Sequence, residues 1–315
     1  MVINKVLLLG GSGFIGTSVA EQLSARGVFV TVPTRRLERA KHLFLLPTVA
    51  VVEADVFRAA ELEQLTRHQD AVINLAGTLH GDFERIHVAF PKLVAETCAK
   101  TGVTRLIHMS ALNADTNGPS EYLRSRGRGE AAVWTVSNAN PSLAVTMFRP
   151  SVVFGERDKF INMFAALVKL FPLVPLGSPD AQFQPVWVED VARAIVTSID
   201  QSATRNQTYP LVGPKVYTLR ELLEFVAGVI GRRRLIVGLG TGLSMMQARV
   251  FGALPGKLIT PDNVRSMSLP STSDQRLPAL FGRPAAMESV VPGYLRGDRG
   301  GGRARYQRFR DPAGR

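Results

Sequence analysis

The stretch SEYLRSRGRGEAAVW, residues 120–134, contains a tyrosine and an arginine at a spacing suited to proton transfer. Tyr122 and Arg126 are four positions apart, so on a helix their side chains share one face. A cation beside a tyrosine hydroxyl lowers its pKa and favours its use as an acid or base. Gly127 and Gly129 each cost this helix about 1 kcal/mol relative to alanine. We therefore expect close packing against a cofactor or a neighbouring helix to compensate.

A second group of residues, LLLGGSGFIGTSVAEQL, has the composition of a phosphate-binding turn. Gly10, Gly13 and Gly16 lie between a predicted strand and a predicted helix, where glycine lets the backbone approach a pyrophosphate. The helix start, with Phe14 and Ile15, supplies free N–H groups and a positive dipole end. The turn therefore predicts a dinucleotide site.

The end of the second predicted strand, VTVPTRRLERAKH, distinguishes between the two nicotinamide cofactors. An acidic residue there would bind the adenosine ribose 2′-OH and favour NAD, but the sequence has Thr34, Arg35 and Arg36. Arginine can pair with a 2′-phosphate, so NADP(H) is favoured and NAD(H) is the alternative. Both arginines could instead be solvated surface charges.

Two more segments follow predicted strands beside the expected dinucleotide path. Asp55 and Val56 come after the third strand, where an adenine amino group could be recognised. The segment NLAG ends the fourth strand and adds Leu75, Ala76 and Gly77 to the candidate cofactor-binding residues.

The wider pattern alternates short β-branched runs with longer amphipathic ones, which is typical of βαβ units. Strands are expected at 5–10, 28–33, 50–55, 71–77, 105–111 and 143–149, with helices at 13–27 and 87–102 among them. This pattern predicts an α/β fold, a doubly wound parallel Rossmann sheet with helices on both faces.

After Pro150 the pattern loosens, which indicates a smaller C-terminal lobe interleaved with the sheet. We divide the chain into a dinucleotide-binding Rossmann domain (1–158), a substrate or partner lobe (159–292) and a disordered basic tail (293–315). The first half of 241–268 could form an amphipathic helix facing a partner or a membrane, but we expect it to pack in the lobe's core, with Met245 and Met246 as fillers. The segment VGLGTGLS is expected to be a loop.

Composition excludes several classes of protein. A single cysteine rules out a disulfide framework, and no apolar stretch is long enough to span a membrane. The five histidines show no metal-binding spacing, so no metal is expected. The net charge is +12, and residues 293–315 hold seven arginines against two aspartates, without a nucleic-acid-binding signature. A strand expected at about residue 5 leaves no room for a signal peptide, which predicts a cytoplasmic protein. Peripheral contact with the inner face of the membrane is compatible with this prediction.

Over residues 3 to about 275, these segments resemble the short-chain dehydrogenase superfamily in its extended, NAD-dependent epimerase-like branch. The segments YLRSRGRGE, FRPSVVFGERDKFINMFA, PLVPLGS, QPVWVEDVARAI and TPDNVRSM are most similar to the NADPH-binding accessory subunit 9 of respiratory complex I and its bacterial relatives. This resemblance implies a fold that holds NADPH as a structural element in a membrane-associated respiratory or ubiquinone-related assembly.

The resemblance also implies roles for single residues. It matches the glycine turn to the phosphate site, Arg35 to the 2′-phosphate contact, and Pro150 to the residue that flanks the nicotinamide. Tyr122 resembles the catalytic tyrosine, while Arg126 stands where an active member has lysine. Arginine keeps the charge but not the shape, and it cannot join a proton relay as lysine can.

Active members also have a serine or threonine hydroxyl that orients the substrate, and this chain lacks that hydroxyl at the matching position. It comes two residues beyond Ser110, where this chain has Leu112, although Ser110 or Asn113 could take its place. We therefore favour an accessory NADP(H)-binding module. The alternative is an active NAD(P)H-dependent oxidoreductase or epimerase for an apolar or sugar-like substrate, with Tyr122 as acid/base and Arg126 and Ser110 beside it.

Overall fold

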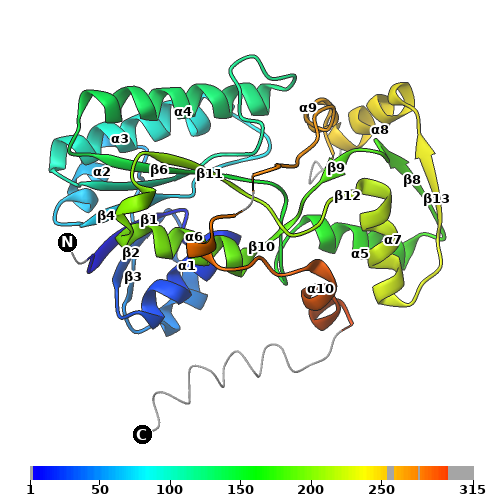
Figure 1. Ribbon diagram of the computed structural model, residues 1–315, viewed down its shortest axis with the longest axis horizontal. Coiled ribbons are helices and arrows are strands. Elements are labelled where there is room, and N and C mark those ends of the chain that lie inside the picture. The colour runs from blue at the N-terminus through cyan, green and yellow to red at the C-terminus, as the bar shows by residue number, and fades with distance from the viewer. Residues whose placement is uncertain (1–2, 254–258, 276, 297–315) are drawn as a thin grey trace, which may run out of the picture.

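The computed structural model describes residues 3–253, 259–275 and 277–296. A seven-stranded sheet forms its larger lobe, in the order β11-β6-β5-β4-β1-β2-β3 (Figure 1). All its neighbouring strands are parallel, and the order reverses between β1 and β4. The predicted doubly wound Rossmann sheet is therefore confirmed. Its strands are β1 Lys5–Leu9, β2 Phe29–Thr34, β3 Val49–Glu53, β4 Ala71–Asn74, β5 Arg105–Met109, β6 Ala144–Pro150 and β11 Gln207–Leu211.

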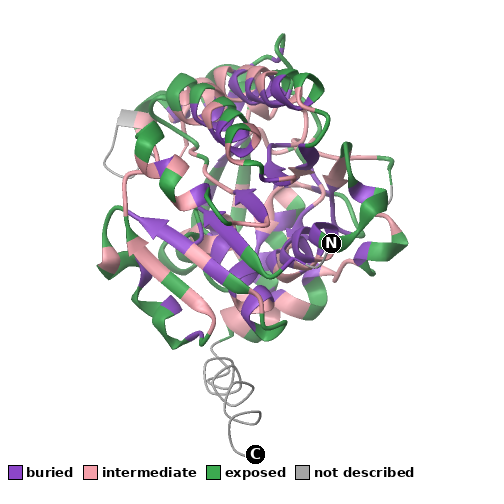
Figure 2. Cartoon of the chain, turned by 90° about the vertical axis from the view of Figure 1, so that its left-hand side faces the viewer, coloured by how far each residue is buried: buried purple, intermediate pink, exposed green. Residues whose placement is uncertain are grey.

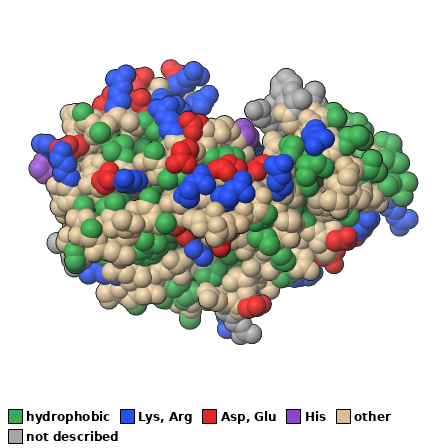
Figure 3. All heavy atoms as spheres, turned by 90° about the horizontal axis from the view of Figure 1, so that it is seen from above, with side chains coloured by type: hydrophobic (Ala, Val, Ile, Leu, Met, Phe, Trp, Pro, Cys, Tyr) green, Lys and Arg blue, Asp and Glu red, His purple; other side chains and the backbone are tan. Residues whose placement is uncertain are grey.

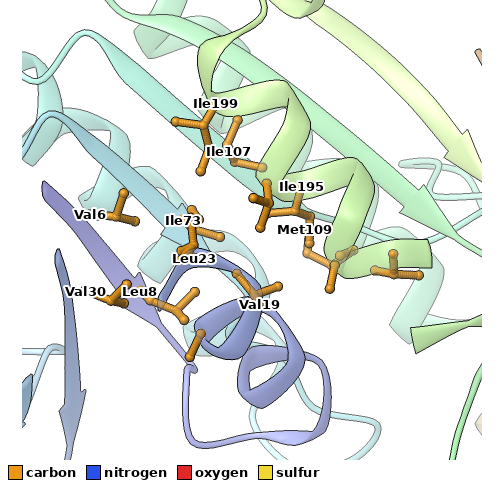
Figure 4. Close-up of a cluster of buried hydrophobic side chains, with 14 of the residues drawn as sticks. Val6, Leu8, Val19, Leu23, Val30, Ile73, Ile107, Met109, Ile195 and Ile199 are labelled. Carbon is orange, nitrogen blue, oxygen red and sulfur yellow. The ribbon is translucent and has the colours of Figure 1, made fainter. Parts of the chain in front are cut away.

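Helices cover both faces of this sheet (Figure 1). On one face lie α1 Phe14–Ala25 and α6 Val188–Asp200; on the other lie α2 Ala59–Thr66, α3 Phe90–Thr101 and α4 Glu121–Ala139. Figure 4 shows Val19 and Leu23 of α1 and Ile195 of α6 packed against Leu8 and Ile73 of the sheet. The central strands are buried on both faces (Figure 2), which explains why they are continuous apolar runs in the sequence.

The smaller lobe has its own hydrophobic core, built mainly from α5 and α7. Its helices are α5 Phe160–Leu170, α7 Leu219–Ile230, α8 Thr241–Ala253, α9 Pro261–Ser266 and α10 Met287–Leu295. Its short strand pairs are β7 Val153–Phe154 with β10 Val186–Trp187, β8 Leu173–Gly177 with β13 Leu235–Leu239, and β9 Gln182–Phe183 with β12 Tyr217–Thr218. Between these elements the chain returns to the large sheet through α6 and β11, so the two lobes are interleaved.

Two sequence expectations differ from this arrangement. The segment VGLGTGLS is not a loop, because it contains the end of β13 and the start of α8. The α10 helix continues to Leu295, three residues into the expected tail, whereas residues 297–315 lie outside the described residues. Four short helical segments complete the described elements: 3₁₀ helices at Leu37–Leu45, Ser202–Thr204 and Ala279–Phe281, and a π-helical turn at Glu84–Ala89.

The glycines of α4 allow it to touch neighbouring backbone. A Cβ atom on Gly129 would lie 1.8 Å from the carbonyl oxygen of His87, and one on Gly127 would lie 2.4 Å from the carbonyl carbon of Asp115. The expected compensation for glycine in this helix is therefore close packing against the π-helical turn and a loop. Gly228 in α7 differs, because a Cβ atom there would meet no atom within 4 Å.

We expect Gly129→Ala to lower the free energy of unfolding by roughly 1–3 kcal/mol, because overpacking outweighs alanine's better helix propensity. The matched Gly228→Ala variant should instead raise it by up to about 1 kcal/mol. Urea titration followed by circular dichroism measures both changes. A stabilised Gly129→Ala protein would show that α4 does not depend on this contact.

Candidate functional site: a dinucleotide groove with an altered catalytic end

A cavity of about 580 Å³ opens at the carboxyl ends of the strands in the large lobe. Five of the predicted cofactor residues line it: Gly10, Arg35, Arg36, Val56 and Ala76. Thr34, which the sequence analysis named beside the two arginines, also lines it. Its other lining residues were not singled out from the sequence: Leu9, Ser12, Pro33, Arg39, Ala54, Phe57 and Phe90. Ligands of doubly wound sheets bind at this edge, near the reversal of strand order.

The glycine turn joins β1 to α1 as a compact loop beside the cavity. Gly10 has φ +80°, and its carbonyl oxygen accepts a hydrogen bond from the Gly13 N–H at 3.0 Å. A Cβ atom on Gly16 would lie 2.3 Å from the same oxygen, so only glycine allows this contact. Phe14 and Ile15 are the first residues of α1, where backbone N–H groups have no acceptor within the helix.

Three arginines occupy the end of the cavity beyond β2. Arg35, Arg36 and Arg39 are all exposed, and none forms an ion pair within the described residues. The hydroxyl of Thr34 accepts a hydrogen bond from the Arg36 N–H, which folds the chain back at this point. Arg39 follows Arg36 by one turn of 3₁₀ helix, and that spacing in TRRLER was the signal by which it could have been found.

The third strand contributes its two predicted residues differently. Val56 lines the cavity, but Asp55 is absent from its lining. The Asp55 carboxylate accepts a hydrogen bond from the Phe57 N–H at 3.3 Å and lies 3.8 Å from the Arg58 guanidinium. It therefore stabilises the turn that presents Val56 and Phe57 to the cavity.

Tyr122 and Arg126 do not line this cavity. They lie beside the carboxyl ends of β4 and β5, where Arg126 is buried against the Tyr122 ring. Its guanidinium carbon lies 5.5 Å from the centre of the Tyr122 ring, and its Nη1 donates to the Met109 carbonyl oxygen at 3.1 Å. Its Nη2 is 2.3 Å from the position that a Cβ on Gly77 would occupy. The arginine is 8% exposed, has no carboxylate partner among the described residues, and its Nε makes no hydrogen bond there.

The predicted hydroxyl group is close in sequence to this contact but has no partner of its own. Ser110 follows Met109 at the end of β5, and its buried Oγ makes no hydrogen bond to any described residue. The backbone of Leu112 donates to the carbonyl oxygen of Pro150, which holds that predicted nicotinamide neighbour against this loop. Asn113 instead donates its side-chain amide to Pro270 of the small lobe at 2.8 Å. Ser110 therefore has the unpaired hydroxyl.

His87 also lies at this site, although the sequence indicated no role for it beyond the absence of metal-binding spacing among the five histidines. Its Nε2 accepts from the Thr78 N–H at 3.1 Å, so in the neutral ring Nδ1 carries the proton and donates to Ser125 at 2.9 Å. The Ser125 hydroxyl in turn donates to the Tyr122 carbonyl oxygen. The imidazole also packs edge-on against the Tyr122 ring at 5.5 Å. No spacing motif marks it, because the π-helical turn is what directs it inward.

The small lobe supplies a carboxylate to the N-terminus of α4, the helix that carries Tyr122 and is here called the tyrosine helix. The two carboxylate oxygens of Asp262 in α9 accept from the Glu121 and Tyr122 N–H groups at 2.9 and 3.0 Å. Ser120 caps the same helix by accepting from the Leu123 N–H. Carboxylates are favourable at helix N-termini, so this contact fixes Tyr122 relative to α9.

The reversed sheet and its glycine turn define an α/β fold of the dinucleotide-binding type. The sequence profile of the NAD dependent epimerase/dehydratase family matches residues 6–211, and the chain belongs to this family. Over 284 residues it is 31% identical to the mouse NADH dehydrogenase [ubiquinone] 1 alpha subcomplex subunit 9, covering 87% of this chain and 74% of that protein. The predicted likeness to this subunit is confirmed.

The chain is also similar in sequence to a fungal protein of related name. The NADH-ubiquinone oxidoreductase 40 kDa subunit of Neurospora crassa is 31% identical over 234 residues, which cover 72% of this chain and 60% of the fungal protein. The solved UDP-glucose 4-epimerase of Thermotoga maritima, with UDP-glucose, superimposes with a TM-score of 0.70 over 93% of this chain and 96% of its own, at 16% identity. At that identity the likeness concerns the fold alone.

Two absences complete the description of the site and apply only to the part of the chain that the structure describes. No group of three or more histidine, cysteine, aspartate or glutamate side chains there is arranged to hold a metal ion. Likewise, none of the helices within these residues has the length and apolar character needed to cross a bilayer.

The two buried histidines near Arg126 predict acid sensitivity. Burial, reinforced by the Arg126 charge, lowers the pKa of both His87 and His108 from 6.5 to about 3. The unfolded chain therefore binds more protons than the folded one below about pH 6.5, which destabilises the fold there, whereas above that pH the rings are neutral in both states and the effect vanishes. The free energy of unfolding should fall by up to about 1.4 kcal/mol per pH unit for each histidine between pH 6 and 4.

Urea unfolding across this pH range measures the slope. A His108→Asn variant lacks one titrating ring, so its slope should be shallower than that of the wild type. Equal slopes in the two proteins would show that His108 is not held neutral in the fold.

Proposed function

We propose that this protein binds NADP(H) through the groove of its large lobe and serves as an accessory, cofactor-holding module rather than as a catalyst. The observation that carries this proposal is the contrast between the cavity, here called the adenosine end, and the separate site of Tyr122 and Arg126, here called the catalytic end. The adenosine end has three arginines without ion pairs within the described residues, whereas the catalytic end has a buried arginine in place of lysine.

The adenosine end fits a phosphorylated dinucleotide. A Cβ atom on Gly16 would clash with the backbone of Gly10 and Gly11, so glycine there preserves the tight turn that a pyrophosphate would approach. Val56 and Phe57 offer apolar contacts for a planar base, and Arg35, Arg36 and Arg39 offer charge to a 2′-phosphate. A dinucleotide without that phosphate would gain no ion pair from these exposed arginines, which supports NADP(H) over NAD(H).

The catalytic end is poorly arranged for a proton relay. When bound, a nicotinamide supplies or accepts hydride, and a partner group must then move a proton at the substrate oxygen. The Arg126 guanidinium donates one hydrogen bond to the Met109 carbonyl oxygen and lies against Gly77. Unlike lysine, arginine does not release a proton to a relay. His87 is held neutral by burial and already uses both ring nitrogens. The arrangement thus supports tight retention of cofactor more than turnover.

The relatives support a respiratory assembly as the setting. The mouse and fungal proteins are named as subunits of NADH dehydrogenase [ubiquinone] and NADH-ubiquinone oxidoreductase. We extend this to the present chain as a proposal: it associates with a respiratory or ubiquinone-related complex, peripherally at the inner, cytoplasmic face of the membrane.

A second function has its own observation in its favour. Tyr122 is half-buried with a cation against its ring, and the Ser110 hydroxyl at the end of β5 is buried without a partner among the described residues. The alternative is therefore an NAD(P)H-dependent oxidoreductase or epimerase for an apolar or sugar-like substrate, with Tyr122 as acid/base.

We expect the double variant Arg35→Ala/Arg39→Ala to bind NADPH roughly 10- to 100-fold more weakly, because charge-assisted hydrogen bonds to the 2′-phosphate are lost. Its affinity for NADH should change little. Titration of nucleotide fluorescence measures both constants, and Arg67→Ala, an exposed arginine on the C-terminal side of α2, is the matched control. Equal losses for NADPH and NADH would contradict a 2′-phosphate contact.

Turnover separates the two candidate functions. Bound NADPH should stay reduced in the presence of quinones or carbonyl compounds in the wild type, in Tyr122→Phe and in Arg126→Lys, because the wild type lacks a working relay. Absorbance of the reduced nicotinamide reports its oxidation. Oxidation by the wild type that Tyr122→Phe abolishes would refute the accessory role and support the enzyme.

A further inference from the structure

The α8 helix packs with its small side chains inward and its large apolar ones outward. Ser244 and Ala248 are buried against the rest of the lobe, whereas Leu243, Met246 and Val250 are 53%, 57% and 59% exposed. These three are spaced i, i+3 and i+7, so they form one stripe, here called the helix stripe. The sequence expectation that this segment fills the core is wrong for Met246 and for the stripe as a whole.

The strands beneath α8 extend this apolar surface. Leu173 of β8 and Leu235 of β13 are register partners and are 47% and 62% exposed, while Val174 is buried in the small-lobe core. Gly177 lies on the same face of β8 as Leu173, and a Cβ atom there would meet Ser244 and Gln247 of α8. The helix therefore covers one end of this strand face, and the two leucines remain uncovered beside it. Figure 3 shows hydrophobic side chains gathered at the small-lobe end of the molecule.

Cations surround this surface. Lys169, Arg232, Arg233 and Arg249 are exposed, and neither 169–177 nor 231–250 contains an aspartate or glutamate. Large apolar side chains bordered by long cationic ones suit an interface that is apolar below and anionic above. A second copy of the chain fits poorly, because a twofold interface would bring the same cations against each other.

We propose that the helix stripe, with Leu173 and Leu235, docks the protein onto an anionic lipid bilayer. The apolar side chains enter the boundary between headgroups and acyl chains, and the surrounding arginines meet the lipid phosphates. This deepens the membrane association of the proposed function by naming the surface, and it does not depend on which nucleotide the groove holds.

The test is co-sedimentation of the full-length protein with phosphatidylcholine vesicles that contain or lack phosphatidylglycerol. The stripe variant is Leu243→Ser/Met246→Ser/Val250→Ser. Its matched control is Phe29→Ser/Phe44→Ser/Leu45→Ser, which removes comparably exposed apolar side chains from the large lobe. The charge variant Arg232→Glu/Arg233→Glu is paired with Arg157→Glu/Arg205→Glu, since all four arginines are exposed.

We expect the wild type to bind the anionic vesicles and the stripe variant to lose about tenfold or more in partitioning, because burial of several large side chains is lost. The charge variant should lose binding as well, and both controls should bind like the wild type. Part of the wild-type binding should survive at about 1 M salt, where the Debye length is about 3 Å.

No wild-type binding, or equal binding by the wild type and the stripe variant, would overturn the proposal and leave a protein partner as the occupant. NADPH titration of the same samples keeps the two proposals separate. A stripe variant that binds NADPH normally but not vesicles supports the docking surface. Vesicle binding by a protein that fails to bind NADPH refutes only the cofactor proposal.

Discussion

Arg126 places a guanidinium inside the protein with no carboxylate partner among the described residues, and the catalytic end is arranged around that charge. A buried charge is costly unless hydrogen bonds or other charges compensate it. The Met109 carbonyl oxygen supplies one bond, the absence of a side chain at Gly77 supplies space, and the Tyr122 ring offers its face. His87 and His108 remain neutral beside it. Arg126 thereby joins the ends of β4 and β5 to α4.

The tyrosine helix depends on both lobes. Asp262 of the small lobe binds its first N–H groups, the π-helical turn packs on Gly129, and Glu130 pairs with Arg149 of β6. The small lobe thus helps to fix Tyr122 through α9. A partner or a membrane that contacts α8 would act on α9 as well, since these two helices pack together.

Much of the fold follows from the sequence because parallel strands are continuous apolar runs and the glycine turn has a fixed spacing. Gly10, Arg35, Val56 and Ala76 could be placed at one cavity for the same reason, since carboxyl ends of parallel strands meet at one edge. Contacts between residues far apart in the sequence could not be predicted in this way. The role of His87 depends on a π-helical turn and that of Asp262 on a contact 140 residues away from Tyr122, and neither has a local pattern.

The exposed face of α8 was misjudged for a related reason. Hydrophobic periodicity reports that a helix has an apolar side, but it does not report what that side meets. The stripe at Leu243, Met246 and Val250 has the same pattern as a core-facing helix, and only the burial of Ser244 and Ala248 reveals its direction.

The central claim is that the groove retains a phosphorylated dinucleotide without consuming it. The most direct measurement is to purify the protein, denature it and identify the released nucleotide by chromatography and mass spectrometry. The account predicts NADP(H), held in near-equal amount to the protein and persisting when quinones or carbonyl compounds are added before denaturation. Release of NAD(H) instead, or of NADP⁺ formed only after such a compound is added, would contradict it.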